Sequence, residues 1–160
     1  MFRFLFSRKS ASGLLTSTLY NERTFFRAFY SDVRHSTTSV LIESPFLTIK
    51  RSQELGRVIK KLRKRNVKVR INTREPRHHT PDLRGQAHES IKILKSAGAR
   101  VYVCSDYRHR KLAVIDGHIL WEGSLNIISQ SKSQEIMRRT DSKQLATQML
   151  RFTRAYNNYW

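Results

Sequence analysis

Apolar residues recur along much of the chain at the three- and four-residue spacing of an amphipathic helix. The clearest stripe consists of Phe25, Phe26, Phe29 and Val33. One face of a helix presents residues at this spacing, so burying that face would bring three aromatic rings into the core. We therefore expect a first helix over residues 20–33.

The same spacing predicts three further helices. Ser52 is placed to cap one of them, and a second runs from Asp82 to Gly98, a residue suited to the left-handed conformation of a C-cap. The last begins at Ser142. The apolar faces expected for these helices consist of Leu55, Val58, Ile59 and Leu62; of Ala87, Ile91 and Leu94; and of Leu145, Met149, Phe152 and Tyr156.

Between the helical segments the apolar residues follow the shorter period of strands. The strands predicted in this way cover residues 39–42, 67–71, 99–104, 111–115, 119–121 and 135–139. Asp116 and Gly117 form a hairpin-type turn, whereas two prolines predict a loop over residues 72–81. Strands that alternate with helices indicate the α/β class. We expect a mixed, mostly parallel β-sheet flanked by helices on both faces.

The length of 160 residues suits one domain, which we expect over residues 20–160 after an N-terminal segment, residues 1–19, of uncertain order. The apolar and basic start suits a first strand, with a transit peptide as the alternative. The longest stretch without an ionisable acid, Lys or Arg runs only from Ser10 to Asn21, too short to cross a membrane. The single cysteine, Cys104, excludes an internal disulfide. We expect a cytoplasmic protein without stable membrane insertion.

The net charge of +19 sets this chain apart from ordinary soluble proteins. Such a charge attracts polyanions, of which nucleic acid is the first candidate and an anionic membrane surface the second. Twelve basic residues against two acids lie between Lys50 and Arg77. A His78–His79 pair in the same stretch has no carboxylate at metal-binding spacing, so we predict no metal site and no cofactor. The nucleic-acid-binding residues predicted from this cluster are Arg57, Lys60, Lys61, Lys64, Arg74 and Arg77.

A second segment carries groups suited to phosphate chemistry. Its pattern is H-x-K-x4-D-x6-G-S-x-N, from His109 to Asn126. The strand period of two places His109 and Lys111 on one face, about 7 Å apart. A histidine can attack phosphorus or transfer a proton near neutral pH, and a lysine neutralises a phosphate oxygen. Gly123 allows close approach of the backbone to an anion, and the residue after it, Ser124, offers a short donor.

This pattern resembles the HKD signature of the phospholipase D superfamily. Ser44-Pro45-Phe46 and Glu135 also match that family, and the single motif resembles its small bacterial Nuc-like endonuclease branch. The resemblance implies the phospholipase D-like α-β-α sandwich. It also implies a metal-independent phosphodiesterase whose active site is shared by two HKD motifs, here across a homodimer. One histidine forms a phosphohistidine, and the other protonates the leaving oxygen and later activates water.

Carried over to this chain, the resemblance assigns both histidine roles to His109, one in each subunit. It makes Lys111 and Asn126 the phosphate ligands, with Ser124 in support. Asp116 has a role that is more structural than chemical, and Glu135 orients or polarises a histidine. Two other functions stay open: a lipid phosphodiesterase, which would need an exposed apolar lip, and an inactive nucleic-acid-binding module, which a broken motif would favour.

Overall fold

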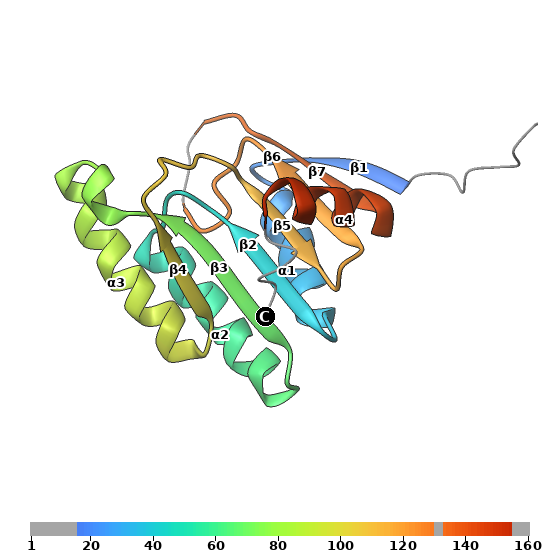
Figure 1. Cartoon of the computed structure of the whole chain (residues 1–160), viewed down its shortest axis with the longest axis horizontal. Coiled ribbons are helices and arrows are strands. Elements are labelled where there is room, and N and C mark those ends of the chain that lie inside the picture. The colour runs from blue at the N-terminus through green and yellow to red at the C-terminus, as the bar shows by residue number, and fades with distance from the viewer. Residues whose placement is uncertain (1–15, 130–132, 155–160) are drawn as a thin grey trace, which may run out of the picture.

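The strand Ser39–Glu43 (β2) is buried along its whole length, as its uninterrupted apolar run predicts. It lies at the centre of the fold in the computed structural model, which describes residues 16–129 and 133–154. On one side β2 pairs in parallel with β3 (Lys68–Arg74), and on the other it pairs antiparallel with β5 (Leu112–Ile115). The alternation of strand and helix along the chain thus produces a sheet with β2 in its interior (Figure 1).

The described strands form one seven-stranded sheet in the order β1-β7-β6-β5-β2-β3-β4. Its three parallel strands, β2, β3 and β4, end at the same edge of the sheet, because parallel neighbours run in one direction. The hairpin predicted at Asp116-Gly117 joins β5 to β6. The remaining strands are β1 (Thr16–Asn21), β4 (Arg100–Cys104), β6 (Ile119–Gly123) and β7 (Ile136–Asp141).

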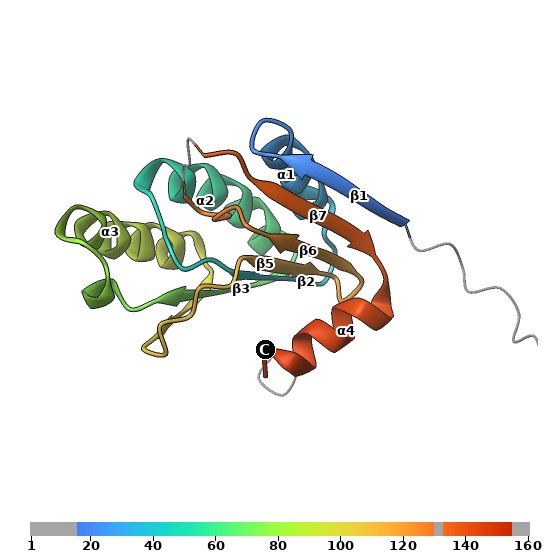
Figure 2. The same cartoon turned by 90° about the horizontal axis from the view of Figure 1, so that it is seen from above.

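Helices cover both faces of the sheet (Figure 2). On one face lie α1 (Phe25–His35), α2 (Ile49–Lys64) and α3 (Pro81–Ala97), and on the other lies α4 (Lys143–Phe152). The larger core lies under the first three helices, where the fully buried Trp121 packs against the Phe25 and Phe29 rings. A smaller core joins Leu150 of α4 to Leu41 of β2.

The predicted α/β class with a mixed, helix-flanked sheet is confirmed, but the expectation of mostly parallel strands is wrong. Among the described strands two pairings are parallel and four are antiparallel. The difference comes largely from β7 and from β1, a strand that we did not predict because its side chains are mostly exposed. β1 occupies residues expected to lie before the domain or in the first helix, so that helix begins only at Phe25.

Three local predictions also differ from the structure. Ser52 does not cap α2: Thr48 holds the N-cap position, and Ser52 is buried within the first turn. The predicted loop over residues 72–81 contains the end of β3 and a short 3-10 helix, Pro76–His78. α4 buries Ala146 and Leu150, while Phe152, expected on the inner face, is exposed. Tyr156 and residues 1–15 lie outside the described residues.

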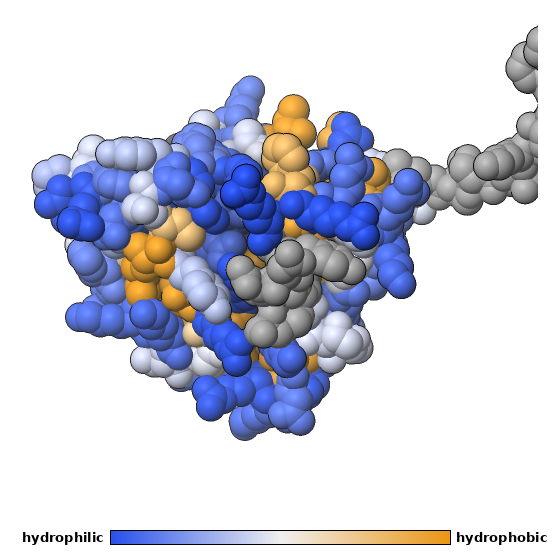
Figure 3. Space-filling view, viewed as in Figure 1, coloured by the Kyte–Doolittle hydropathy of each residue, from blue (hydrophilic) through white to orange (hydrophobic). Residues whose placement is uncertain are grey.

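The outer surface is mainly hydrophilic on the face that carries α4 (Figure 3). α4 packs against β6 and leaves the edge strand β4 open on this side, and Val103 of β4 is exposed. Among the described helices none is long and apolar enough to cross a membrane. The cytoplasmic location stays a prediction.

Candidate active site

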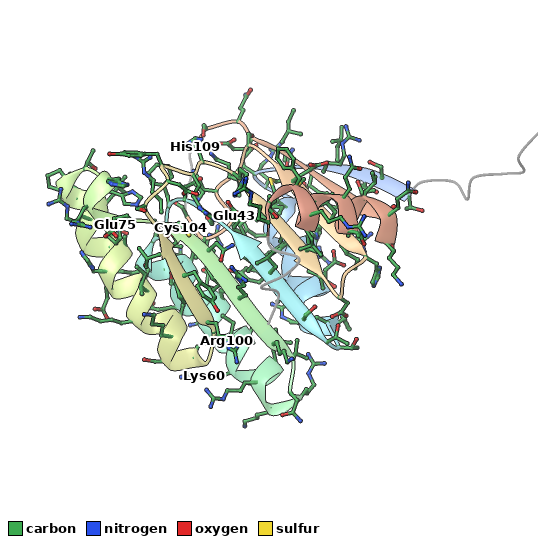
Figure 4. The ribbon with its side chains drawn as sticks, viewed as in Figure 1. Glu43, Lys60, Glu75, Arg100, Cys104 and His109 are labelled. Atoms are coloured by element: carbon green, nitrogen blue, oxygen red, sulfur yellow. The ribbon has the colours of Figure 1, made fainter. Side chains whose placement is uncertain are left out.

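The candidate active site lies at the sheet edge where β2, β3 and β4 end. The chain leaves β4 at Cys104, and residues 105–111 return it to the sheet at the start of β5. This connection carries His109, which lies at the same end of the molecule as Glu43 and Cys104, opposite Lys60 and Arg100 (Figure 4). The carboxyl ends of parallel strands are the usual position for a ligand site in an open α/β sheet.

His109 and Lys111 are in direct contact. The Lys111 Nζ lies 2.6 Å from the His109 Nδ1 and donates to the His109 carbonyl at 2.6 Å. Both residues lie just before β5, since that strand begins at Leu112, one residue later than predicted. The Phe46 ring meets the exposed His109 ring edge-on, with 5.8 Å between the ring centroids. The His109 ring therefore packs against Phe46 and is otherwise exposed to solvent.

The charges at this edge favour a neutral imidazole. Burial and the charges of Lys111 and Arg74 lower the pKa of His109 below its ordinary value. Burial also lowers the pKa of Lys111, against the opposing effect of Glu135. A neutral imidazole keeps one nitrogen lone pair, which is available for attack once the Lys111 ammonium turns from the ring to an anionic oxygen. The pair therefore combines a nucleophile with a fixed positive charge.

A buried ion-pair cluster holds the His109 segment in place. Glu43 is fully buried at the end of β2, where its Oε1 accepts from Arg110 Nε at 2.7 Å and from Arg108 Nη1 at 3.3 Å. Arg108 and Arg110 alternate with His109 and Lys111, so the two arginines face Glu43 while the other pair faces the site. We did not identify Glu43 from the sequence, although an acid at the end of a buried apolar strand was a signal for it.

Ser124 and Glu135 come together at the ends of β6 and β7. The Ser124 hydroxyl donates to Glu135 Oε2, and the Ser124 N–H donates to the Ile136 carbonyl at 2.9 Å. Gly123 is required here by its neighbour strand: an added Cβ would lie 2.1 Å from the Ile136 carbonyl oxygen. We expected Gly123 to allow the close approach of an anion, whereas in the structure it allows the close approach of β7. The Glu135 charge also acts to raise the pKa of Lys111, the residue in contact with His109.

Asn126 lies in the loop that follows β6. Its Oδ1 is buried and has no hydrogen-bond partner among the described residues. The loop is fixed to the end of β2, because the Ile128 N–H donates to Ser44 Oγ at 3.2 Å and the Thr48 N–H donates to the Ile128 carbonyl at 2.9 Å. The motif's asparagine is therefore anchored next to the Ser44-Pro45-Phe46 segment whose ring contacts His109.

The structure does not bring Asp116 to this group. It lies at the far end of β5, about 20 Å from His109 along an extended chain. Its carboxylate accepts five hydrogen bonds of 2.8–3.1 Å from Thr37, Thr38 and Ser39, at the start of β2. Burial acts to raise the pKa of Asp116, but these hydrogen bonds outweigh it and lower the pKa. Asp116 fastens the turn after β5 to β2.

The predicted nucleic-acid-binding residues divide into two sets. Arg74 lies at the site, close enough to lower the His109 pKa, and Arg77 follows it in the 3-10 helix. The others form the α2 basic face, which is exposed but runs away from the site because α2 returns the chain to the start of β3. Lys60 lies about 17 Å along the axis from the first residue of α2. The residues of the α2 basic face are Arg57, Lys60, Lys61 and Lys64.

The histidine pair after β3 is split between surface and interior. His79 is buried edge-on against Phe46, with ring centroids 5.0 Å apart, and burial lowers its pKa. His78 instead stacks on Tyr107. Among the described residues, no three His, Cys, Asp or Glu side chains are grouped as metal ligands.

The chain is similar to known proteins in sequence and in fold. The family described as "Cardiolipin synthase, PLD-like domain" matches residues 30–156, which include the entire motif from His109 to Asn126. No curated protein gives a significant match. The match covers most of the described sheet, the candidate site and three of the four main helices in full.

Solved structures share the fold at low sequence identity. The phospholipase D family member Nuc from Salmonella typhimurium has a TM-score of 0.72 and 17% identity over 90% of this chain and 95% of its own. NucT from Helicobacter pylori has a TM-score of 0.68 and 20% identity over 86% and 92% of the two chains. TrmBL2, an archaeal chromatin protein with a novel mode of DNA binding, has a TM-score of 0.57 and 12% identity over 92% and 53%.

Proposed function

Because the chain belongs to the phospholipase D-like domain family, we propose that it is a metal-independent nuclease that hydrolyses nucleic-acid phosphodiester bonds. The observation that carries the proposal is the contact between His109 and Lys111, which sets a histidine of lowered pKa 2.6 Å from an ammonium group. The net charge of +19 supports a polyanionic substrate. Nuc, with the same fold, is described as a phospholipase D family member.

The proposed reaction has two steps. The neutral His109 imidazole attacks phosphorus, a nitrogen–phosphorus bond forms, and the phosphorus–oxygen bond to the leaving group breaks. A second, protonated histidine gives its proton to the leaving oxygen. That histidine then takes a proton from water, whose oxygen attacks phosphorus and displaces His109. Lys111 and Asn126 neutralise or hold the phosphate oxygens, for which fixed donors are most effective.

The second histidine is proposed to come from a second copy of the chain. The sequence holds one HKD motif, and twofold symmetry is the commonest way to set a residue against its own copy. An exposed apolar surface next to Lys111 suits such a contact. It includes Leu19, Ile136 and Phe152, which are 58%, 61% and 76% exposed, around a groove of about 450 Å³ that Lys111 also lines.

The dimer has its own test. Sedimentation at assay concentrations is expected to give twice the 18.9 kDa mass of one chain. Mixed dimers of wild type and His109→Ala should lose the turnover of the wild-type subunit as well, because each site needs both histidines. A fully active monomer, or normal turnover for each wild-type subunit in mixed dimers, would contradict the shared site.

Arg74 and Arg77 are proposed to bind phosphates beside the bond that is cut, and the α2 basic face to bind the backbone of a longer strand. Arg74 is close enough to His109 to affect its pKa. The α2 basic face is exposed, and its four side chains form no hydrogen bond or ion pair with the described residues. Surface lysines of this kind neutralise phosphates without reading bases.

The exposed apolar surface also favours a second candidate, a lipid phosphodiesterase. Leu19, Ile136 and Phe152 lie beside Lys111, where an acyl chain could follow a phosphate headgroup. The cationic surface serves an anionic bilayer as well as a nucleic acid. Nucleic acid is preferred because the arginines and lysines extend far beyond the site, whereas the apolar area is small.

One assay compares the candidates. Protein freed of bound metal is incubated in excess EDTA with single- and double-stranded DNA and RNA and, separately, with phospholipid vesicles. We expect cleavage of nucleic acid, its loss in His109→Ala, and an acid-labile, base-stable phosphoryl label on His109 after quenching. His88→Ala, at an exposed histidine of α3, is the matched control.

Two outcomes of this assay would overturn the mechanism: activity that disappears with EDTA and returns with magnesium, or activity that survives His109→Ala. Hydrolysis of the phospholipid vesicles without cleavage of nucleic acid would indicate a lipid phosphodiesterase. Nucleic-acid binding without any cleavage would indicate the inactive binding module.

A further inference from the structure

Tyr107 presents an open aromatic ring beside the candidate nucleophile. It lies in the connection from β4 to β5, two residues before His109, and 64% of its surface is exposed. Its φ of +52° is in the left-handed region, which is uncommon for a bulky residue. The backbone therefore turns at this position in a way that leaves the tyrosine ring out in solvent next to the site.

The Tyr107 ring is nevertheless held in one orientation. The His78 ring stacks on it with centroids 4.0 Å apart and planes 8° from parallel. Arg74 donates from Nη2 to the His78 carbonyl at 3.0 Å, and its guanidinium carbon lies 5.1 Å from the Tyr107 centroid. The two stacked rings, Tyr107 and His78, are called the aromatic platform below. They come from two different connections and meet only in the folded chain.

The chain on the His109 side of Tyr107 is also anchored. Arg108 donates from Nη2 to Asp106 at 2.6 Å and from Nη1 to the fully buried Glu43 at 3.3 Å. Ion pairs that are hydrogen-bonded and partly buried restrict motion more than exposed ones do. The platform thus needs little ordering when a ligand arrives, and a pre-ordered site loses less entropy on binding.

From this arrangement we infer that the aromatic platform binds a nucleobase of the strand whose phosphate lies at His109; the inference rests on the proposed nuclease function. A largely exposed aromatic ring that is held in place by a second ring is the kind of surface on which bases stack. The adjacent Arg74 supplies a cation for the backbone. Two residues of chain span at most about 7 Å, so the backbones of Tyr107 and His109 lie within about one nucleotide of each other.

The inferred site has a consequence for substrate class. In a duplex each base is stacked between its neighbours and paired across the helix, so its faces are not available to the platform. Single-stranded nucleic acid leaves the faces open, and stacking on aromatic side chains is sequence-tolerant because every base has such a face. The chain should therefore prefer single strands, with little preference among bases.

Binding of two oligonucleotides tests the inference without depending on cleavage. The non-cleaving His109→Ala protein is titrated by fluorescence anisotropy with a labelled single strand and with an abasic strand of the same length and charge. We expect the base-bearing strand to bind about tenfold more tightly, a typical value for stacking of one base. Adding Tyr107→Ala should bring the ratio of the two affinities close to one, whereas Tyr107→Phe should retain it.

Tyr102→Ala is the matched control, since Tyr102 is also exposed and contacts an arginine, but on β4 outside the connection. The ratio of affinities for the base-bearing and the abasic strand should be the same in this variant as in the parent His109→Ala protein. An equal affinity for both strands, or a ratio that Tyr107→Ala leaves intact, would overturn the platform. If the base-dependent binding is found while the wild-type chain cleaves no nucleic acid, the proposed nuclease fails and the platform stands. In a cleaving wild type, Tyr107→Ala should raise KM more than it lowers kcat.

Discussion

Gly123→Ala is expected to damage the fold at the site itself. β6 and β7 approach each other so closely at this position that the new Cβ would lie 2.1 Å from the Ile136 carbonyl oxygen, 2.8 Å from Met137 Sδ and 2.9 Å from Met137 Cα. Ordinary contacts begin at about 3.5 Å. The sulfur can move, but the two backbone atoms belong to β7, so that strand must shift by more than about 1 Å.

The magnitude follows from what such a shift breaks. Forcing an extra methyl group into a packed site costs about 1–3 kcal/mol. The hydrogen bonds from the Ser124 N–H to the Ile136 carbonyl (2.9 Å) and from the Ile136 N–H to Ser124 Oγ (3.1 Å) would weaken, at about 1 kcal/mol each. The free energy of unfolding should therefore fall by about 3–5 kcal/mol, a large part of the total for a domain of this size.

Urea unfolding followed by circular dichroism measures this change, and the midpoint should fall by about 1–2 M. Gly85→Ala provides the control. That glycine lies in α3 with no atom within 4 Å of an added Cβ, so alanine should stabilise the helix by about 0.5–1 kcal/mol. If Gly123→Ala unfolds at the wild-type midpoint and loses only activity, the glycine serves anion approach and our account of β7 is refuted.

Three further outcomes follow from the structure. Asp116→Asn should lose the two hydrogen bonds from Thr37 and about 1–2 kcal/mol of stability at pH 7, allowing for partial exposure. Because the pKa of Asp116 is lowered in the folded state, the stabilisation by its carboxylate is lost as the pH falls. Thermal unfolding should therefore show the difference in stability between variant and wild type disappearing below about pH 4. The acid limb of the pH profile of kcat/KM should have its midpoint below about pH 6.5, because burial, Lys111 and Arg74 lower the pKa of His109. Arg74→Gln should move this midpoint to higher pH. A midpoint that does not change would show that Arg74 does not act on His109. Changing Lys60, Lys61 and Lys64 of the α2 basic face to Gln should reduce the slope of log affinity against log salt concentration for duplex binding by up to about three, as measured by filter binding. An unchanged slope would show that the duplex backbone binds elsewhere on the protein.

Features that depend on neighbours in the sequence were predictable from the sequence. Within the described residues helical periodicity located all four α-helices, and the caps at Gly98 and Ser142 are local: Gly98 has a φ of +106°, and Ser142 Oγ accepts from the Leu145 N–H. The contact between His109 and Lys111 is local too, since residues two apart in an extended segment face the same way. The motif therefore predicted the pair of groups at the centre of the candidate site, and the roles assigned to them stay predictions.

Features that depend on residues far apart were decided by the tertiary structure. β1 is a strand because β7 supplies its hydrogen-bond partners, whereas its exposed side chains carry little apolar pattern. Gly123 is needed because β7 passes against it, and Glu43 becomes an anchor because it meets Arg108 and Arg110, more than sixty residues later. Periodicity records which side of an element is buried, but the partner on that side is selected by the packing of the whole sheet. For the same reason the charge count revealed a basic protein, and only the direction of α2 placed most of the predicted phosphate contacts away from His109.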